Sequence, residues 1–71
     1  MGVTTENNIK LTRREMSILK EVAIGRTTPQ IAVNLGLSPE TVKWYRKQLL
    51  VKCSATTSAE VVHKAIMNNI L

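Results

Sequence analysis

The 71-residue sequence has few of the residue types on which several classes of protein depend. Cys53 is its one cysteine, which excludes an internal disulfide framework and a zinc site built on cysteine ligands. No apolar run approaches the roughly 18 residues of a membrane span, and no segment has the features of a signal-peptide core. A lone cysteine is compatible with a reducing compartment, and we therefore expect a cytoplasmic protein without a membrane-inserted segment.

Groups that carry catalysis are also scarce. His63 is the one histidine, and the sequence contains no glycine-rich phosphate-binding loop. No two carboxylates lie three or four residues apart on one predicted helix, where they could share acid–base work. We therefore predict that the chain is not an enzyme and that it binds no cofactor and no metal ion.

Negative charge is the third shortage. There are 5 acidic residues against 10 Lys and Arg, which gives a formal net charge of +5. An excess of this kind points to a polyanionic partner, with nucleic acid ahead of an anionic membrane surface. The length allows one small domain, so one compact unit must carry this interaction.

The chain divides into a short arm and one helical domain. Residues 1–10 are polar and show no periodicity, which predicts a flexible arm before a domain over 11–71. Thr12 and Glu15 have the spacing of a capping box, in which each side chain bonds the backbone of the other residue. Apolar residues then recur at helical spacing, and this predicts a first helix over about 13–24.

Two more helix starts follow in close succession. Thr28 and Pro29 predict an N-cap followed by proline at the first helical position, and Gly36 ends this second helix. Ser38 and the proline after it repeat the pattern, so we expect a third helix over about 39–52. No segment shows the alternation of a strand.

A fourth helix begins at a second capping box, from Thr57 to Glu60. Its apolar residues cover a broader arc than one contact with the core requires. We expect one edge of this arc to pack on the first helix and the other to form a two-fold dimer contact through Val61, Val62 and Ala65. The fold class is therefore all-α, with four short helices.

Only Gly36 and Leu37 separate the second predicted helix from the third. A link this short joins two strongly angled helices, which is the helix-turn-helix arrangement, and its turn commonly needs a glycine able to take positive φ. Ala32 is small, as is needed where the two helices cross closely. The alternative is an ordinary helical hairpin with capped ends.

The 39–52 helix has two distinct faces when it is wound at 100° per residue. An apolar stripe within about 60° of one direction is predicted to be buried and consists of Val42, Tyr45, Leu49 and Cys53. The opposite side presents Lys43, Trp44, Lys47 and Val51. From residue 41 to residue 53 there are four basic residues and no acidic ones. A helix with an apolar back and a basic front has the dimensions to enter the DNA major groove.

At these residues the chain resembles the LuxR-type (GerE-like) helix-turn-helix domain. The resemblance covers about residues 11–71 and rests on a combination of motifs: Leu11-Thr12-Arg13-Arg14-Glu15, Gly25, Ile31-Ala32, Leu35, Ser38, Thr41-Val42-Lys43 and Lys52. It implies a four-helix domain of a bacterial transcription regulator, with the third helix in the major groove and the fourth at a dimer contact. The implied partners are double-stranded DNA, a second copy in a weak dimer that DNA strengthens, and RNA polymerase, but no membrane.

Carried over by position, the resemblance assigns roles to single residues. The base-reading residues it implies are Lys43, Trp44 and Lys47. The phosphate contacts it implies, aided by the N–H groups at helix starts, are Thr28, Ser38, Thr41, Arg46 and Lys52.

Several positions depart from the family pattern. Cys53 and Ser54 replace a usual Leu-Gly, while Val51 and Ser58 stand where cations are frequent. Tyr45 occupies a position where histidine is common. The missing cations at Val51 and Ser58 keep open a different function, in which the fold binds a protein through Trp44 and Val51 and no longer binds DNA. A promoter-reading region of a sigma factor is the alternative within the DNA-binding class.

Overall fold

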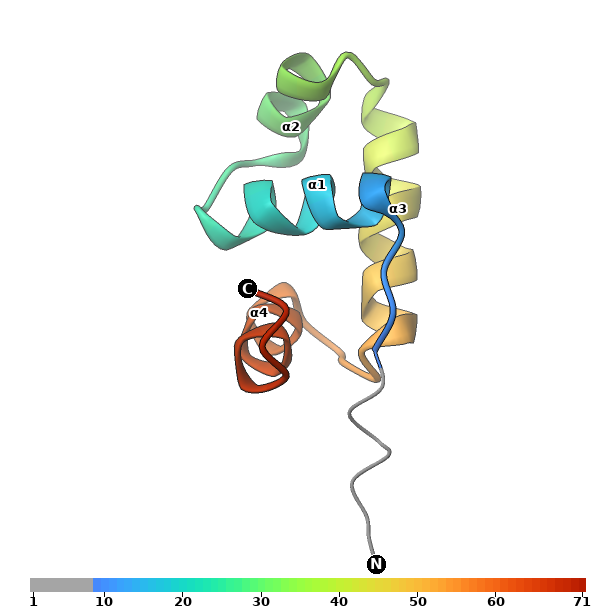
Figure 1. The fold of residues 1–71 in the computed structure, drawn as a ribbon. Helices are drawn as coiled ribbons and strands as arrows, with labels where there is room; N and C mark the ends of the chain where they lie inside the picture. The colour runs from blue at the N-terminus through green and yellow to red at the C-terminus, as the bar shows by residue number, and fades with distance from the viewer. Residues whose placement is uncertain (1–8) are drawn as a thin grey trace, which may run out of the picture.

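The computed structural model describes residues 9–71, and the domain predicted from the sequence is seen there as four helices (Figure 1). They are α1 (Arg13–Ala23), α2 (Thr28–Leu35), α3 (Pro39–Lys52) and α4 (Ser58–Met67). No strand occurs among the described residues, which confirms the all-α prediction. The predicted arm, 1–10, lies mostly outside them. Ile9 already packs against the core, so packing begins before residue 11.

Helix α1 begins at the predicted capping box. The Thr12 hydroxyl accepts a hydrogen bond from the Glu15 N–H at 3.1 Å, and the Glu15 carboxylate accepts one from the Thr12 N–H at 2.9 Å. Two backbone donors at the helix start, which have no partner within the helix, are satisfied in this way.

The predicted N-cap of α2 was wrong by one residue. Thr27, and not Thr28, is the N-cap, and its hydroxyl accepts from the Gln30 N–H at 3.3 Å. The Gln30 side chain accepts in return from the Thr27 N–H at 2.9 Å. Only the earlier threonine has a glutamine three residues ahead, so the reciprocal pair selects that start. Thr28 is consequently the first residue of the helix and Pro29 the second.

The starts of α3 and α4 are close to those predicted. The Ser38 hydroxyl accepts from the Thr41 N–H at 3.1 Å, and the Thr57 hydroxyl accepts from the Glu60 N–H at 3.1 Å. The second capping box is incomplete, because the Glu60 carboxylate accepts instead from the N–H and hydroxyl of Thr56, at 2.9 and 3.1 Å.

Gly36 forms the turn between α2 and α3. It has φ +68° and ψ +36°, in the left-handed region that glycine adopts without steric cost. A Cβ atom built at this position meets nothing within 4 Å, so the turn requires glycine for its backbone conformation and not for space. The predicted helix-turn-helix connection is thus present.

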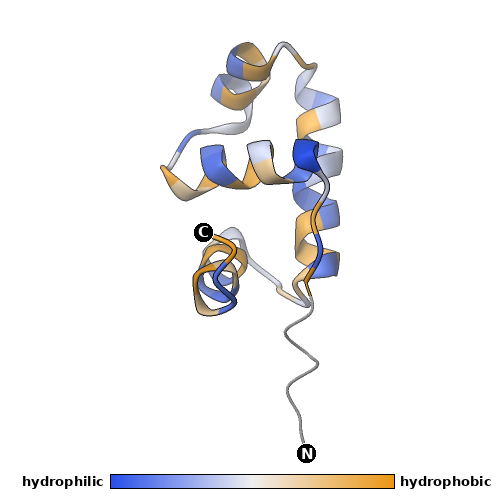
Figure 2. Cartoon of the chain, viewed as in Figure 1, coloured by the Kyte–Doolittle hydropathy of each residue, from blue (hydrophilic) through white to orange (hydrophobic). Residues whose placement is uncertain are grey.

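The core lies where the other three helices pack on one side of α3 (Figure 1). Hydrophobic and hydrophilic residues alternate in bands along α3 (Figure 2), and the burial of its side chains shows which of them face the core. All four helices contribute buried apolar side chains, which are Ile18, Leu19, Ile31, Ala32, Val42, Leu49, Cys53, Val61 and Ala65. Val42, Leu49 and Cys53 confirm the predicted stripe, and Tyr45 is half-buried beside it.

The predicted dimer contact requires a correction. Val61 is 2% exposed and Ala65 is 0% exposed, because this edge of α4 packs into the core of the same chain. Neither side chain has surface left for a second copy. Val62, the third predicted contact, is half-buried and stays accessible.

Candidate nucleic-acid interface

The side of α3 turned away from the core carries two lysines and two large apolar side chains. Lys43, Trp44, Lys47 and Val51 are all exposed, as the helical wheel predicted. Trp44 keeps 56% of its surface accessible and Val51 keeps 69%. We call these four residues the α3 outer face. It combines hydrogen-bond donors with apolar groups. Base edges in the major groove are read through both hydrogen bonds and apolar contacts.

Trp44 is oriented by the residue that follows it. Its ring and that of Tyr45 have centroids 5.1 Å apart and planes at 81°, an edge-to-face arrangement. Tyr45 in turn packs against the hydrophobic core. The indole is therefore held by a ring anchored in the domain, while more than half of its surface faces outward.

Three of the predicted phosphate contacts lie in the first turns of α2 and α3. Thr28 is half-buried at the start of α2. Ser38 and Thr41 are joined by a hydrogen bond of 2.9 Å between their hydroxyls, at the start of α3. Helix N-termini attract anions through their free N–H groups and the positive end of the helix dipole, so both places suit a phosphate.

The other two predicted phosphate contacts are engaged within the domain. Arg46 donates from Nη2 to the Ser58 hydroxyl at 2.8 Å. Lys52 Nζ lies 2.7 Å from the carboxylate of Glu15, and the Glu15 side chain is only 6% exposed. The structure therefore brings Arg46 and Lys52 to partners on α4 and α1, a result that helical periodicity alone did not indicate.

The carboxyl group of Glu15 is buried where α1 meets α3. Burial raises the pKa of this carboxyl, but hydrogen bonds from Lys52 and Thr12, together with the lysine charge, outweigh burial and lower it below its usual value. Glu15 therefore stays ionised and neutralises part of the Lys52 charge. Burial likewise raises the pKa of the Cys53 thiol, which keeps it protonated as a small core residue.

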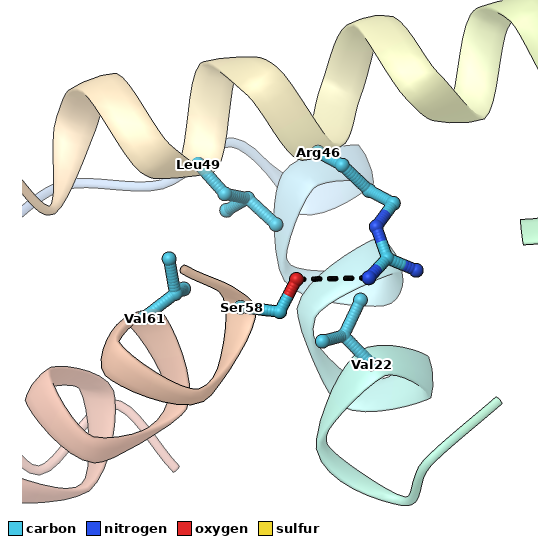
Figure 3. Close-up of a pocket in the computed structure, with 5 residues that line it drawn as sticks. All are labelled: Val22, Arg46, Leu49, Ser58 and Val61. Carbon is cyan, nitrogen blue, oxygen red and sulfur yellow. Dashed lines mark hydrogen bonds between the residues drawn. The ribbon is translucent and has the colours of Figure 1, made fainter. Parts of the chain in front are cut away.

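Residues of three helices surround the Arg46–Ser58 hydrogen bond (Figure 3). Val22 comes from α1, Leu49 from α3 and Val61 from α4. They leave a cavity of about 10 Å³, which is about the room that one water molecule needs. The cavity is a feature of packing and offers no space for a larger ligand.

The accessible side of α4 carries two exposed apolar residues, Ile66 and Met67, beside Val62, which packs partly against the core. Ile66 is 56% exposed and Met67 is 68% exposed, while Val62 lies half-buried one turn before Ile66. Two of the three residues predicted from the sequence to lie on an open edge of α4, Val61 and Ala65, are buried in the core. Among residues 9–71, no helix combines the length and apolar character needed to cross a membrane. Within the same residues, no group of three metal-ligating side chains is assembled.

Comparison with known proteins gives the same assignment along most of the chain. A family model described as bacterial regulatory proteins, luxR family, matches residues 10–65. The transcriptional regulatory protein UhpA of Salmonella typhimurium is 39% identical over 54 residues, which are 76% of this chain and 28% of that protein. The probable transcriptional regulator ycf29 of Cyanophora paradoxa is 39% identical over 67 residues, covering 92% of this chain and 32% of that protein.

A solved structure supports the fold as well as the family. The dimeric LuxR-type receptor VqmA of Vibrio cholerae superposes with a TM-score of 0.80 at 28% identity, covering 92% of this chain and 29% of that one. The chain thus spans less than a third of these relatives, 28%, 32% and 29% of their lengths. The family match favours a regulator over the sigma-factor alternative. The chain belongs to the LuxR family of bacterial regulatory proteins, as a helix-turn-helix domain of the type with which that family binds DNA.

Proposed function

We propose that this chain binds double-stranded DNA in a sequence-specific manner for a bacterial transcription regulator, with α3 in the major groove. The observation that carries the proposal is the α3 outer face, where Lys43 and Lys47 flank an exposed Trp44 on the side opposite the core. After Glu40, α3 contains no acidic residue. An exposed cationic helix face of this kind matches the groove in size and charge.

Each exposed residue has a definite part in this proposal. Lys43 and Lys47 donate to guanine O6 and N7, and Trp44 packs against a thymine methyl group or a sugar. Phosphates on either side of the major groove bind at the helix starts that contain Thr28, Ser38 and Thr41. The ammonium group of Lys52 is paired with Glu15, so Lys52 contacts a phosphate only if that group serves both partners at once.

Two copies bind together in the proposed complex. The accessible edge of α4, with Val62, Ile66 and Met67, forms a two-fold contact in place of the one predicted from the sequence. An edge this small gives a weak free dimer, and DNA supplies much of the association energy. The two α3 helices then meet half-sites about one helical turn, roughly 34 Å, apart. We expect the complex in the cytoplasm, where RNA polymerase is a candidate partner.

Selection of binding sites from a random duplex pool tests the proposal. Wild-type protein should recover a palindromic site, and its affinity should fall steeply with salt because bound phosphates release counterions. Lys47→Ala should weaken binding about tenfold, the order of one lost base contact, and relax the preference at one base position. Lys20→Ala removes the same charge from an exposed position on α1 and is the matched control.

The exposure of Trp44 and Val51 also favours a second candidate, a module that binds a protein partner. This candidate predicts no duplex binding at any salt concentration. Failure to recover any binding site from the duplex pool would favour the protein-binding module over the DNA-binding proposal. An equal loss by Lys47→Ala on all sequences would instead make Lys47 a phosphate contact within the DNA-binding proposal.

A further inference from the structure

A single polar link joins α3 to α4. The guanidinium of Arg46 donates to the Ser58 hydroxyl at 2.8 Å. Within residues 9–71 this is the one hydrogen bond between side chains of the two helices, since Lys64 of α4 reaches the carbonyl of Ser54 in the loop. Because Ser58 is the first residue of α4, the bond ties the N-terminal end of that helix to α3.

Buried apolar side chains lie beside this hydrogen bond. Leu49 and Val61, one from each helix, are each 2% exposed beside it (Figure 3). A hydrogen bond from a charged donor is stronger where water is partly excluded. Helix electrostatics do not account for this arginine, because a cation opposes the positive end of the α4 dipole. Its placement therefore calls for a reason other than the stability of α4.

Arg46 lies on the flank of α3, between the exposed and the buried side. It is three residues after Lys43 on the outer face and three residues before the buried Leu49, so by helical geometry it lies about 60° from each, between the two faces. Across the link, α4 carries the exposed Ile66 of the proposed dimer contact. In the proposed dimer, a chain of contacts would therefore connect the second copy, through α4 and the Arg46–Ser58 bond, to the helix proposed to read bases.

We propose that Arg46 is a positioning residue that, through Ser58, sets the angle between α3 and α4 and thereby the separation of the two half-sites that a dimer accepts. The inference rests on the proposed function, since it concerns how the same DNA-binding face is presented. It replaces the phosphate contact that the family resemblance implies for Arg46. A positioning residue acts on the spacing between half-sites, whereas a phosphate contact acts on each half-site alone.

The test compares duplexes that carry two half-sites at spacings varied by single base pairs with a duplex that carries one half-site. Ser58→Ala removes the acceptor without changing the charge, and Arg46→Lys keeps the charge without the planar guanidinium. Both variants should bind the single half-site within about twofold of wild type. Their preference for the best spacing over its neighbours should fall about fivefold or more, the order of losing a partly exposed hydrogen bond to a charged group.

Ser17→Ala is the matched control, because it removes a serine hydroxyl that bonds only the backbone of α1. Circular dichroism establishes that each variant is folded. The inference is overturned if Ser58→Ala and Arg46→Lys keep the wild-type spacing profile. It is also overturned if Arg46→Ala weakens single half-site binding and lowers the slope of log K against log salt by about 0.9, as a lost phosphate contact would. Absence of all duplex binding by the wild type would instead refute the proposed function itself.

Discussion

Lys52, the last residue of α3, places its Nζ atom 2.7 Å from Oε1 of Glu15, in the first turn of α1. The same carboxylate oxygen accepts the Thr12 N–H at 2.9 Å, so one group caps α1 and ties it to the far end of α3. The Glu15 side chain is nearly buried, while that of Lys52 is 36% exposed. The pair therefore holds the orientation of the α3 outer face relative to the rest of the domain.

Glu15→Gln should reduce stability in a pH-dependent way. The folded-state pKa of Glu15 lies below its unfolded value, so its contribution is present above the unfolded pKa and is lost as pH falls through the folded one. Glutamine preserves the capping box but not the charge. We expect a loss of about 1–2 kcal/mol at pH 7, the order of one hydrogen bond between charged groups, measured by urea unfolding. The difference should vanish in acid, once the pH lies below the lowered pKa of Glu15. Glu40→Gln, at an exposed position, is the control, and an equal deficit for Glu15→Gln at pH 7 and in acid would contradict this account.

Ser54→Gly should stabilise the domain. Ser54 follows α3 with φ +51°, in the left-handed region where a side chain costs about 1–2 kcal/mol. Glycine removes this cost but increases the freedom of the unfolded chain, which leaves a net gain of up to about 1 kcal/mol. Thermal denaturation should show a rise of a few degrees. Gly36→Ala, at φ +68° with open space around the new Cβ, should shift the transition in the opposite direction. A lower melting temperature for Ser54→Gly would show that its backbone is not strained.

Local sequence signals predicted the helices and the side of α3 that faces outward. The Thr12–Glu15 capping box and the Val42–Leu49 stripe depend on residues three to seven apart, so helical geometry determines them. The start of α2 lies one residue earlier than predicted because two threonines stand in succession and only Thr27 forms a reciprocal pair with Gln30. The error is only one residue because the interaction that sets a helix start is short-range.

Relations between helices were beyond the reach of the sequence. Periodicity gives the angle between Val61 and Val62 on α4 but not which of them faces the core, and Val61 was consequently placed on the wrong side. The Arg46–Ser58 and Glu15–Lys52 bonds join residues 12 and 37 positions apart. Both depend on where helices cross, which no local pattern specifies. The lysines of the outer face were predictable because they are exposed, so their placement among the described residues depends on helical periodicity and not on where helices cross.

Trp44 should report DNA binding directly. It is the only tryptophan and is 56% exposed, so its emission in the free protein should be that of an indole in contact with water. Insertion of α3 into the major groove should quench this emission or shift it to the blue, and added salt should reverse the change. The measurement is a fluorescence titration with the duplex recovered by selection. Lys47→Ala should give the same final change at higher duplex concentration. Unchanged emission at saturating duplex, with binding shown by an independent method, would place Trp44 outside the interface.

Ile66→Glu should separate dimer formation from folding. Ile66 is 56% exposed on the accessible edge of α4, so a charge there costs the isolated domain little, and the melting temperature should stay within about 2–4 °C of wild type. In the proposed dimer the charge meets its symmetry mate across an apolar contact and must be desolvated. Binding to a palindromic duplex should weaken about tenfold or more, while binding to a single half-site should not change. Ala65→Glu, one residue earlier and fully buried, should unfold the domain. If Ile66→Glu bound both duplexes as wild type does, the two-fold contact would have to lie elsewhere than on this edge of α4.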